Sequence, residues 1–211
     1  MDRTMDGEIC SWIIEFLVRH SADEMLVKKL IQAVPRLSGN ARLNKTLLLH
    51  SIKSEIVAGK VSEKILDHLE MIEAIDRSQR LTIPDSMKQA YCAVALECTA
   101  KYLAGSVDRK GKYLDAVKRI WRGRIENLEK SNASKLVSEE LRSRRRQVEA
   151  ALADKDAGNV LITTNTRNDA ILTVKAYVRE ALRLMGLPFL EKQCNLILER
   201  EYGSGSGAVQ E

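Results

Sequence analysis

Residues 40–72 read NARLNKTLLLHSIKSEIVAGKVSEKILDHLEMI, and this stretch decides the fold class of the chain. Leucine and isoleucine recur in it every three or four residues, a spacing that places apolar side chains on one face of an α-helix. Asn40 and Ser62 occupy the positions of helix N-caps, and Gly59 stands where a glycine commonly ends a helix. The stretch therefore predicts two amphipathic helices that pack antiparallel across a short turn.

The same spacing extends along nearly the whole chain and predicts an all-α fold, a single bundle of about nine helices. Small residues, chiefly alanine and cysteine, fill most faces of the fifth predicted helix, which is therefore expected at the centre of the bundle. The predicted helices lie at residues 8–19, 21–34, 40–59, 62–76, 84–104, 112–130, 135–153 and 168–185, with a last one after Pro188 that ends near Tyr202.

Two stretches do not follow this spacing. Residues 154–166 form the longest irregular segment. Three interpretations stay open for it: a disordered loop, a docking segment, or a sub-boundary between a main body and a final helical pair. Residues 203–211 are rich in glycine and serine and predict a flexible tail, either natural or an added linker. We therefore expect one helical domain over residues 8–202.

The composition limits the class of protein. Apolar residues make up 45% of the 211 and aromatic residues only 4%, so the core must be aliphatic. The four cysteines form no CxxC pair, and charged residues crowd the first eight positions, which argues against a disulfide scaffold and a signal peptide. No apolar run approaches the roughly 18–20 residues that cross a bilayer. We expect an intracellular protein with no membrane segment.

No group of residues suggests catalysis or metal binding. His20, His50 and His68 are isolated, without ligand-type partners at helical spacing, so each is expected to be an ordinary surface or core-edge histidine. Acidic pairs such as Glu139 and Glu140 stand beside basic residues and indicate solvated ion pairs. No phosphate-binding loop, dinucleotide motif or nucleophile elbow occurs. The sequence predicts no enzyme activity, no cofactor and no metal site.

One segment carries most of the positive charge. Between Lys101 and Arg146 there are 14 lysines and arginines against 6 acidic residues, whereas the whole chain has a net charge of only +5. If the helices at 112–130 and 135–153 pair, their cations form one patch that contacts an anionic partner or serves as a nuclear localisation signal. A solvated basic face without a partner is the first interpretation of these cations, and the anionic-partner patch is the second. The candidate contacts are Lys118, Arg119, Arg122, Arg124, Arg142, Arg144, Arg145 and Arg146.

The two tryptophans are the remaining candidates for a binding role. Trp12 and Trp121 each lie in the apolar stripe of a predicted helix. Core packing is the first interpretation of both, and the wall of a groove that holds a partner peptide is the second.

Four segments bear a family resemblance. They are SWIIEFL at residues 11–17, RLNKTLLL at 42–49, SEI at 54–56 and VSEKIL at 61–66. Their order resembles the N-terminal region of plant telomere-repeat-binding-factor-like Myb proteins. The helical pattern and the length are similar to the TRF-homology domain, a helical dimerisation and docking domain. The resemblance covers residues 8–202 and implies a TRF-homology-like fold.

One departure from that family bears on function. Its members read DNA through a C-terminal Myb module with regularly spaced tryptophans, and this chain has only Trp12 and Trp121. The resemblance thus implies a non-enzymatic, nuclear protein-interaction and homodimerisation domain of a telomere- or DNA-associated factor, without its DNA reader. It implies a homodimer with a protein or peptide partner in a nuclear complex, and indirect contact with nucleic acid. The alternative is direct nucleic-acid binding through the basic helices within 112–153.

Overall fold

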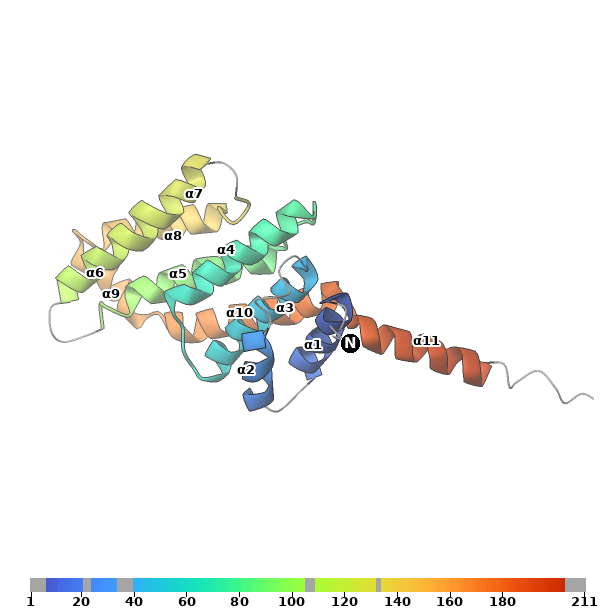
Figure 1. The fold of residues 1–211 in the computed structure, drawn as a ribbon. Helices are drawn as coiled ribbons and strands as arrows, with labels where there is room; N and C mark the ends of the chain where they lie inside the picture. The colour runs from blue at the N-terminus through green and yellow to red at the C-terminus, as the bar shows by residue number, and fades with distance from the viewer. Residues whose placement is uncertain (1–6, 21–23, 34–39, 105–108, 132–133, 204–211) are drawn as a thin grey trace, which may run out of the picture. The chain divides into compact units, whose positions relative to one another are not determined.

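The computed structural model describes residues 7–20, 24–33, 40–104, 109–131 and 134–203 (Figure 1). All regular secondary structure in these residues is helical, with no strand among them, which confirms the all-α prediction. The helices are α1 (Gly7–His20), α2 (Glu24–Ala33), α3 (Ala41–Val57), α4 (Glu63–Ser78), α5 (Asp85–Ala100), α6 (Arg109–Ala116), α7 (Glu126–Ser131), α8 (Glu139–Ala150), α9 (Lys155–Thr163), α10 (Thr166–Met185) and α11 (Phe189–Gly203).

Helices α6 and α7 are joined without a break by a π-helical segment, η2 (Val117–Ile125). The described residues therefore form ten continuous helical segments, close to the predicted nine. The additional segment is α9, and the prediction of an irregular stretch at 154–166 is wrong there. The Asp154 carboxylate accepts a hydrogen bond from the Asp156 amide at 2.9 Å and caps the helix. Leu161, a residue of this helix, is buried.

Of the three helix ends predicted in residues 40–72, two form as expected. The Asn40 side chain accepts a hydrogen bond from the Leu43 amide at 3.0 Å, as expected of an N-cap. Gly59 has a φ of +66° and ends α3 in a Schellman motif, which confirms its predicted position. Ser62 stands at the N-cap of α4 but forms no capping bond. Its hydroxyl donates to the Glu55 carboxylate instead.

The chain forms two compact units. Residues 1–50 and 182–211 make the smaller unit, and residues 51–181 make the larger one. Residues 154–166, where the sequence suggested a sub-boundary, lie within the larger unit. No described helix is long and apolar enough to span a bilayer.

Helix α5 is the centre of the larger unit. Every side chain from Ala90 to Ala100 is buried, and α5 packs against α4, α6, η2 and α8 (Figure 1). Alanine and cysteine allow this close approach on all sides, because their side chains add little volume. The structure confirms the predicted central helix.

The core of the smaller unit is less extensive. Ile14, Val18, Val27 and Leu43 are buried together from α1, α2 and α3. The Glu15 carboxylate, which is 3% exposed, accepts hydrogen bonds from Arg42 at 2.9 and 3.0 Å and from Arg19 at 3.2 Å. The Arg42 guanidinium also donates to the carbonyls of Met185 and Leu187, at 2.7 and 2.9 Å. One arginine thus joins α1, α3 and the end of α10.

Candidate functional site

The basic segment is an ion-pair network. Arg119 donates two hydrogen bonds to Glu63 of α4, at 2.9 and 2.6 Å. Arg124 pairs with two more carboxylates of the same helix, Asp67 and Glu70. The side chains of η2 that face α4 are therefore matched by acidic residues.

Helix α8 binds the other side of this segment. Arg122 donates to Glu149 at 3.2 and 2.7 Å. Arg145 contacts the carboxylates of Glu126 and Glu129 at 2.8 and 3.3 Å. Arg142 pairs with Glu129 and Glu139. The helices at 109–131 and 139–150 do pack together, but carboxylates stand between their cations.

The π-helical geometry of η2 explains which arginines share a face. In a π-helix the hydrogen bonds link residues five apart, so residues five apart lie closer to one face than they do in an α-helix. Arg119 and Arg124 are five apart, and both reach α4. In an α-helix, at about 100° per residue, they would lie on well-separated faces. Gly123 lies inside this segment, where a Cβ atom would come within 3.2 Å of the Lys118 carbonyl oxygen.

The pKa values of the carboxylates in this network depend on their surroundings. Hydrogen bonds from Arg119 hold the pKa of Glu63 below its ordinary value, and those from Arg122 lower the pKa of Glu149. Groups with lowered pKa values add stability above their ordinary pKa and lose it as the pH falls through the lowered value. Burial has the opposite effect on Glu70 and raises its pKa, although the Tyr91 hydroxyl donates to it at 2.6 Å. The arginines therefore stabilise charged carboxylates within this chain.

Five of the eight candidate cations are thus bound to acidic side chains of the described chain. Arg144 donates to Gln147 at 3.1 Å, whereas Lys118 and Arg146 are exposed. Three of the partners are the carboxylates of α4, which sequence reasoning missed. Their spacing, Glu63, Asp67 and Glu70, is the helical one and marks a single acidic face.

Reversing the charge of Arg145 is expected to lower the free energy of unfolding by about 1 kcal/mol, because three carboxylates surround it. The neighbouring exposed residue supplies the matched control, and Arg146→Glu should change stability by less than about 0.5 kcal/mol. Urea unfolding of both variants measures the difference. Equal effects of the two substitutions would show that the network adds nothing specific.

The two tryptophans differ in environment. Trp121 is fully buried, and its indole Nε1–H donates to the Thr99 hydroxyl at 2.8 Å, so it packs in the core and forms no groove wall. Trp12 is half-buried in the smaller unit. Its ring stacks on that of Phe189 at the start of α11, with centroids 4.0 Å apart. Trp12 thus anchors α11 to α1.

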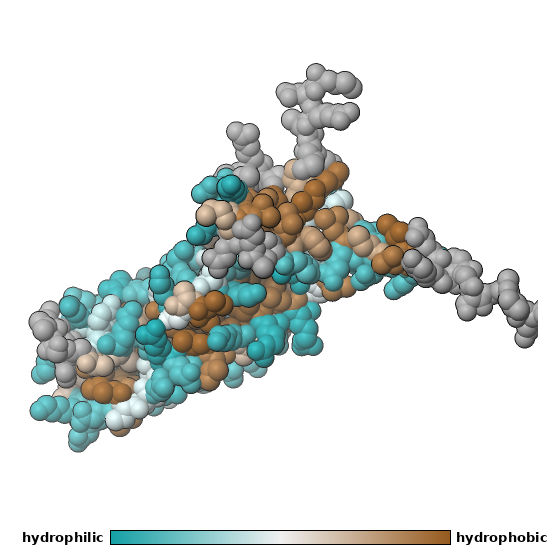
Figure 2. Space-filling view, turned by 90° about the horizontal axis from the view of Figure 1, so that it is seen from below, coloured by the Kyte–Doolittle hydropathy of each residue, from teal (hydrophilic) through white to brown (hydrophobic). Residues whose placement is uncertain are grey.

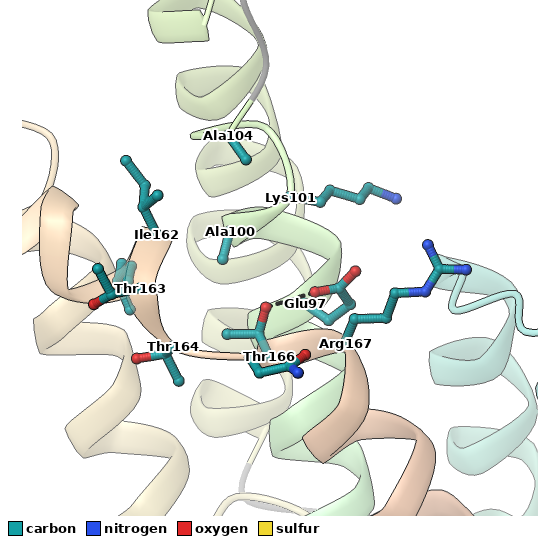
Figure 3. A pocket seen from close by; sticks show the side chains of 11 residues that line it. Glu97, Ala100, Lys101, Ala104, Ile162, Thr163, Thr164, Thr166 and Arg167 are labelled. Carbon is teal, nitrogen blue, oxygen red and sulfur yellow. Dashed lines mark hydrogen bonds between the residues drawn. The ribbon is translucent and has the colours of Figure 1, made fainter.

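A groove of about 410 Å³ opens beside the end of α5 (Figure 3). One side is formed by the end of α9 and the connection to α10, residues 161–167. The other is formed by α5 and the residues after it, through Glu97, Ala100, Lys101 and Ala104. Part of the 154–166 segment therefore lines a groove.

Apolar side chains are exposed mainly on the smaller unit. Of the fourteen large apolar residues exposed among the described ones, eight belong to this unit, although it is the shorter of the two. Figure 2 shows apolar side chains gathered over part of the surface. These eight are Ile9, Met25, Leu26, Leu184, Leu187, Leu196, Ile197 and Leu198.

Helix α11 contributes three of them. Every described side chain from Cys194 to Arg200 is exposed, and Figure 1 shows the helix extending beyond its contact with α1. An isolated helix of this length is marginal in water, because most helical stability comes from packing. The exposed part of α11 is therefore a candidate surface for another chain.

Comparisons with known proteins found no match for the chain. No family model matches the chain, and no curated protein or solved structure matches it. Among the described residues, no three histidine, cysteine or acidic side chains are grouped so that they could hold a metal ion. The resemblance to the TRF-homology domain stays a prediction from the sequence.

Proposed function

We propose that the chain is a non-enzymatic protein-interaction and homodimerisation domain, and that α11 forms the dimer interface. The observation that carries this proposal is the run of exposed side chains on α11, with Leu196, Ile197 and Leu198 between 39% and 54% exposed. Large contiguous apolar patches on the surface of a soluble protein mark interaction sites. A symmetric dimer pairs the same patch on both copies and buries each with the other.

The nuclear and telomere-associated setting belongs to the same proposal. It rests on the sequence resemblance quoted above, in which an all-helical domain precedes a separate DNA reader. An interaction domain of this kind would bring a nuclear protein partner to a DNA-associated factor and would contact nucleic acid only indirectly.

Direct nucleic-acid binding is the weaker alternative, because the arginines it requires already have partners. Arg119, Arg122 and Arg145 would each have to leave a carboxylate before binding a phosphate. The released carboxylates would then repel the phosphate backbone. Salt-dependent binding of DNA by the chain, with these ion pairs still formed, would support this alternative.

Replacing Ile197 by glutamate is expected to dissociate the dimer, because the new charge would be buried in the interface. Asn195→Glu, which adds the same charge two residues away on the same exposed helix, is the control and should leave the dimer intact or only weakened. Light scattering of the unmodified chain and both variants measures the mass. Loss of the dimer in both variants would point to charge repulsion rather than to an apolar interface at Ile197.

A further inference from the structure

We propose that the groove beside Glu97 binds a basic side chain, a lysine ammonium or an arginine guanidinium, of a partner segment that carries an apolar residue next to it. The inference rests on the proposed function in one respect, since it gives the chemistry of a protein partner for an interaction domain. It does not depend on the dimer interface, because the groove lies within the larger unit.

The first observation is the state of the Glu97 carboxylate. Glu97 is only 7% exposed, and its Oε2 atom accepts a hydrogen bond from the Thr166 hydroxyl at 2.6 Å (Figure 3). Its other oxygen has no hydrogen-bond partner in the described part of the chain, and no described cation forms an ion pair with it. This oxygen is not among the buried unpaired side-chain atoms of the described residues, so it is open to the groove, and a cation that reaches it gains a charge-assisted hydrogen bond.

The second observation is the direction of the helices around the groove. Both α5 and α9 end there, since Ala100 and Thr163 are their last residues. The carbonyl groups at helix C-termini carry partial negative charge, which favours a cation. Helix α10 begins there with the opposite polarity, but Asn165 accepts hydrogen bonds from its Asn168 and Asp169 amides. The last carbonyls of α5 already accept hydrogen bonds from the amides of Lys101, Tyr102 and Leu103, so the helix ends add little and the Glu97 carboxylate is the main ligand for a cation.

The walls of the groove fit an apolar neighbour of that cation. Ala100, Ala104, Leu161 and Ile162 line it, and Ile162 is 43% exposed although it is large and apolar. An apolar side chain of the partner would remove this surface from water. The combination of one carboxylate and an apolar wall matches a short peptide segment better than a free ion.

Two cations of the chain limit which partners fit. Lys101 and Arg167 also line the groove, and the Arg167 guanidinium is held by the Gly59 carbonyl. They repel every cation in the groove, and they repel a polycation more strongly than a single charge that contacts Glu97 directly. The groove is therefore expected to select one basic residue flanked by neutral or acidic ones over a polycation such as spermine.

The test uses the full chain and two synthetic peptides, acetyl-Gly-Leu-Arg-Leu-Gly-amide and the same peptide with citrulline, the neutral isostere of arginine. Binding is followed through the backbone amide NMR signals of Ala100, Thr164 and Arg167. We expect the arginine peptide to bind, and Glu97→Gln to weaken it by about ten- to a hundredfold, the effect of losing one buried charge-assisted hydrogen bond. The citrulline peptide should bind the unmodified chain as weakly as the arginine peptide binds the variant.

A second pair of variants leaves Glu97 in place. Ala104→Trp fills the groove and should abolish binding, whereas Ala74→Trp, at an exposed position on α4, should not. The thermal stability of Glu97→Gln should be unchanged or higher, because a carboxylate that serves a partner does not stabilise the free chain. A marked loss of stability with unchanged peptide binding would mean that Glu97 only supports the fold.

Several outcomes would overturn the inference. The first two are equal binding of the arginine and citrulline peptides, and equal binding of the arginine peptide by Glu97→Gln and by the unmodified chain. The other two are no binding by the unmodified chain at millimolar peptide, and binding of arginine amide or spermine as tight as that of the arginine peptide. The dimer is tested separately. The Ile197→Glu variant should still bind the arginine peptide, and Glu97→Gln should still have the mass of the unmodified chain, so failure of either proposal can be recognised by itself.

Discussion

Replacing Trp121 by alanine is expected to lower the free energy of unfolding by about 3–5 kcal/mol, the largest effect of any single substitution considered. Trp121 is the largest of the fully buried side chains and packs against the central helix α5. Its removal leaves a cavity that α5 cannot fill, because the residues around it are small and already close-packed. It also removes the indole N–H that donates a hydrogen bond to the Thr99 hydroxyl.

Urea unfolding followed by circular dichroism measures this effect. Thr99→Val removes the hydroxyl that accepts from the indole and donates to the Ala95 carbonyl, and it should cost about 1–3 kcal/mol, because the buried indole N–H is then unpaired. Trp12→Ala, at a half-buried position in the smaller unit, is the matched tryptophan control and should cost less than Trp121→Ala. A loss below about 1 kcal/mol for Trp121→Ala would contradict its place in the core.

Replacing Arg42 by alanine is expected to destabilise the smaller unit by about 2–3 kcal/mol, less than for a fully buried pair because Arg42 is partly exposed. The substitution leaves the buried Glu15 carboxylate with Arg19 alone. It also leaves the carbonyls of Met185 and Leu187 without their donor. Three segments of the smaller unit lose a shared contact at once.

Hydrogen exchange measures this loss where it occurs. Amides of α1 and of the first half of α3 should exchange faster in Arg42→Ala, whereas those of α5 should keep their protection. Arg19→Ala is the control, because Arg19 contacts the same carboxylate with one hydrogen bond and should have a smaller effect. Faster exchange in α5 equal to that in α1 would show that Arg42 stabilises the chain globally rather than this unit.

The helices and their ends could be predicted because they follow from local spacing. Gly59 and Asn40 define the ends of α3 through contacts with residues three to five positions away. The central place of α5 followed from its small residues. Ser62 failed as a cap because Glu55, on the preceding helix, offers its hydroxyl a charged acceptor. That contact depends on how the two helices pack, which local spacing does not define.

The basic segment could be located from the sequence, but its state could not be predicted. Whether eight cations form a free patch depends on which carboxylates face them, and Glu63, Asp67 and Glu70 lie more than fifty residues earlier in the chain. The π-helical turn is a second reason, since α-helical spacing separates Arg119 from Arg124. The groove at Glu97 joins α5 to residues about 65 positions later and carries no local motif.

The most direct test of the central claim is the solution mass of the unmodified chain, measured by light scattering at low and high salt. Homodimerisation through the apolar side chains of α11 predicts a mass near twice the 23.7 kDa of the monomer, independent of salt. A mass of one chain at every protein concentration and salt concentration would contradict it.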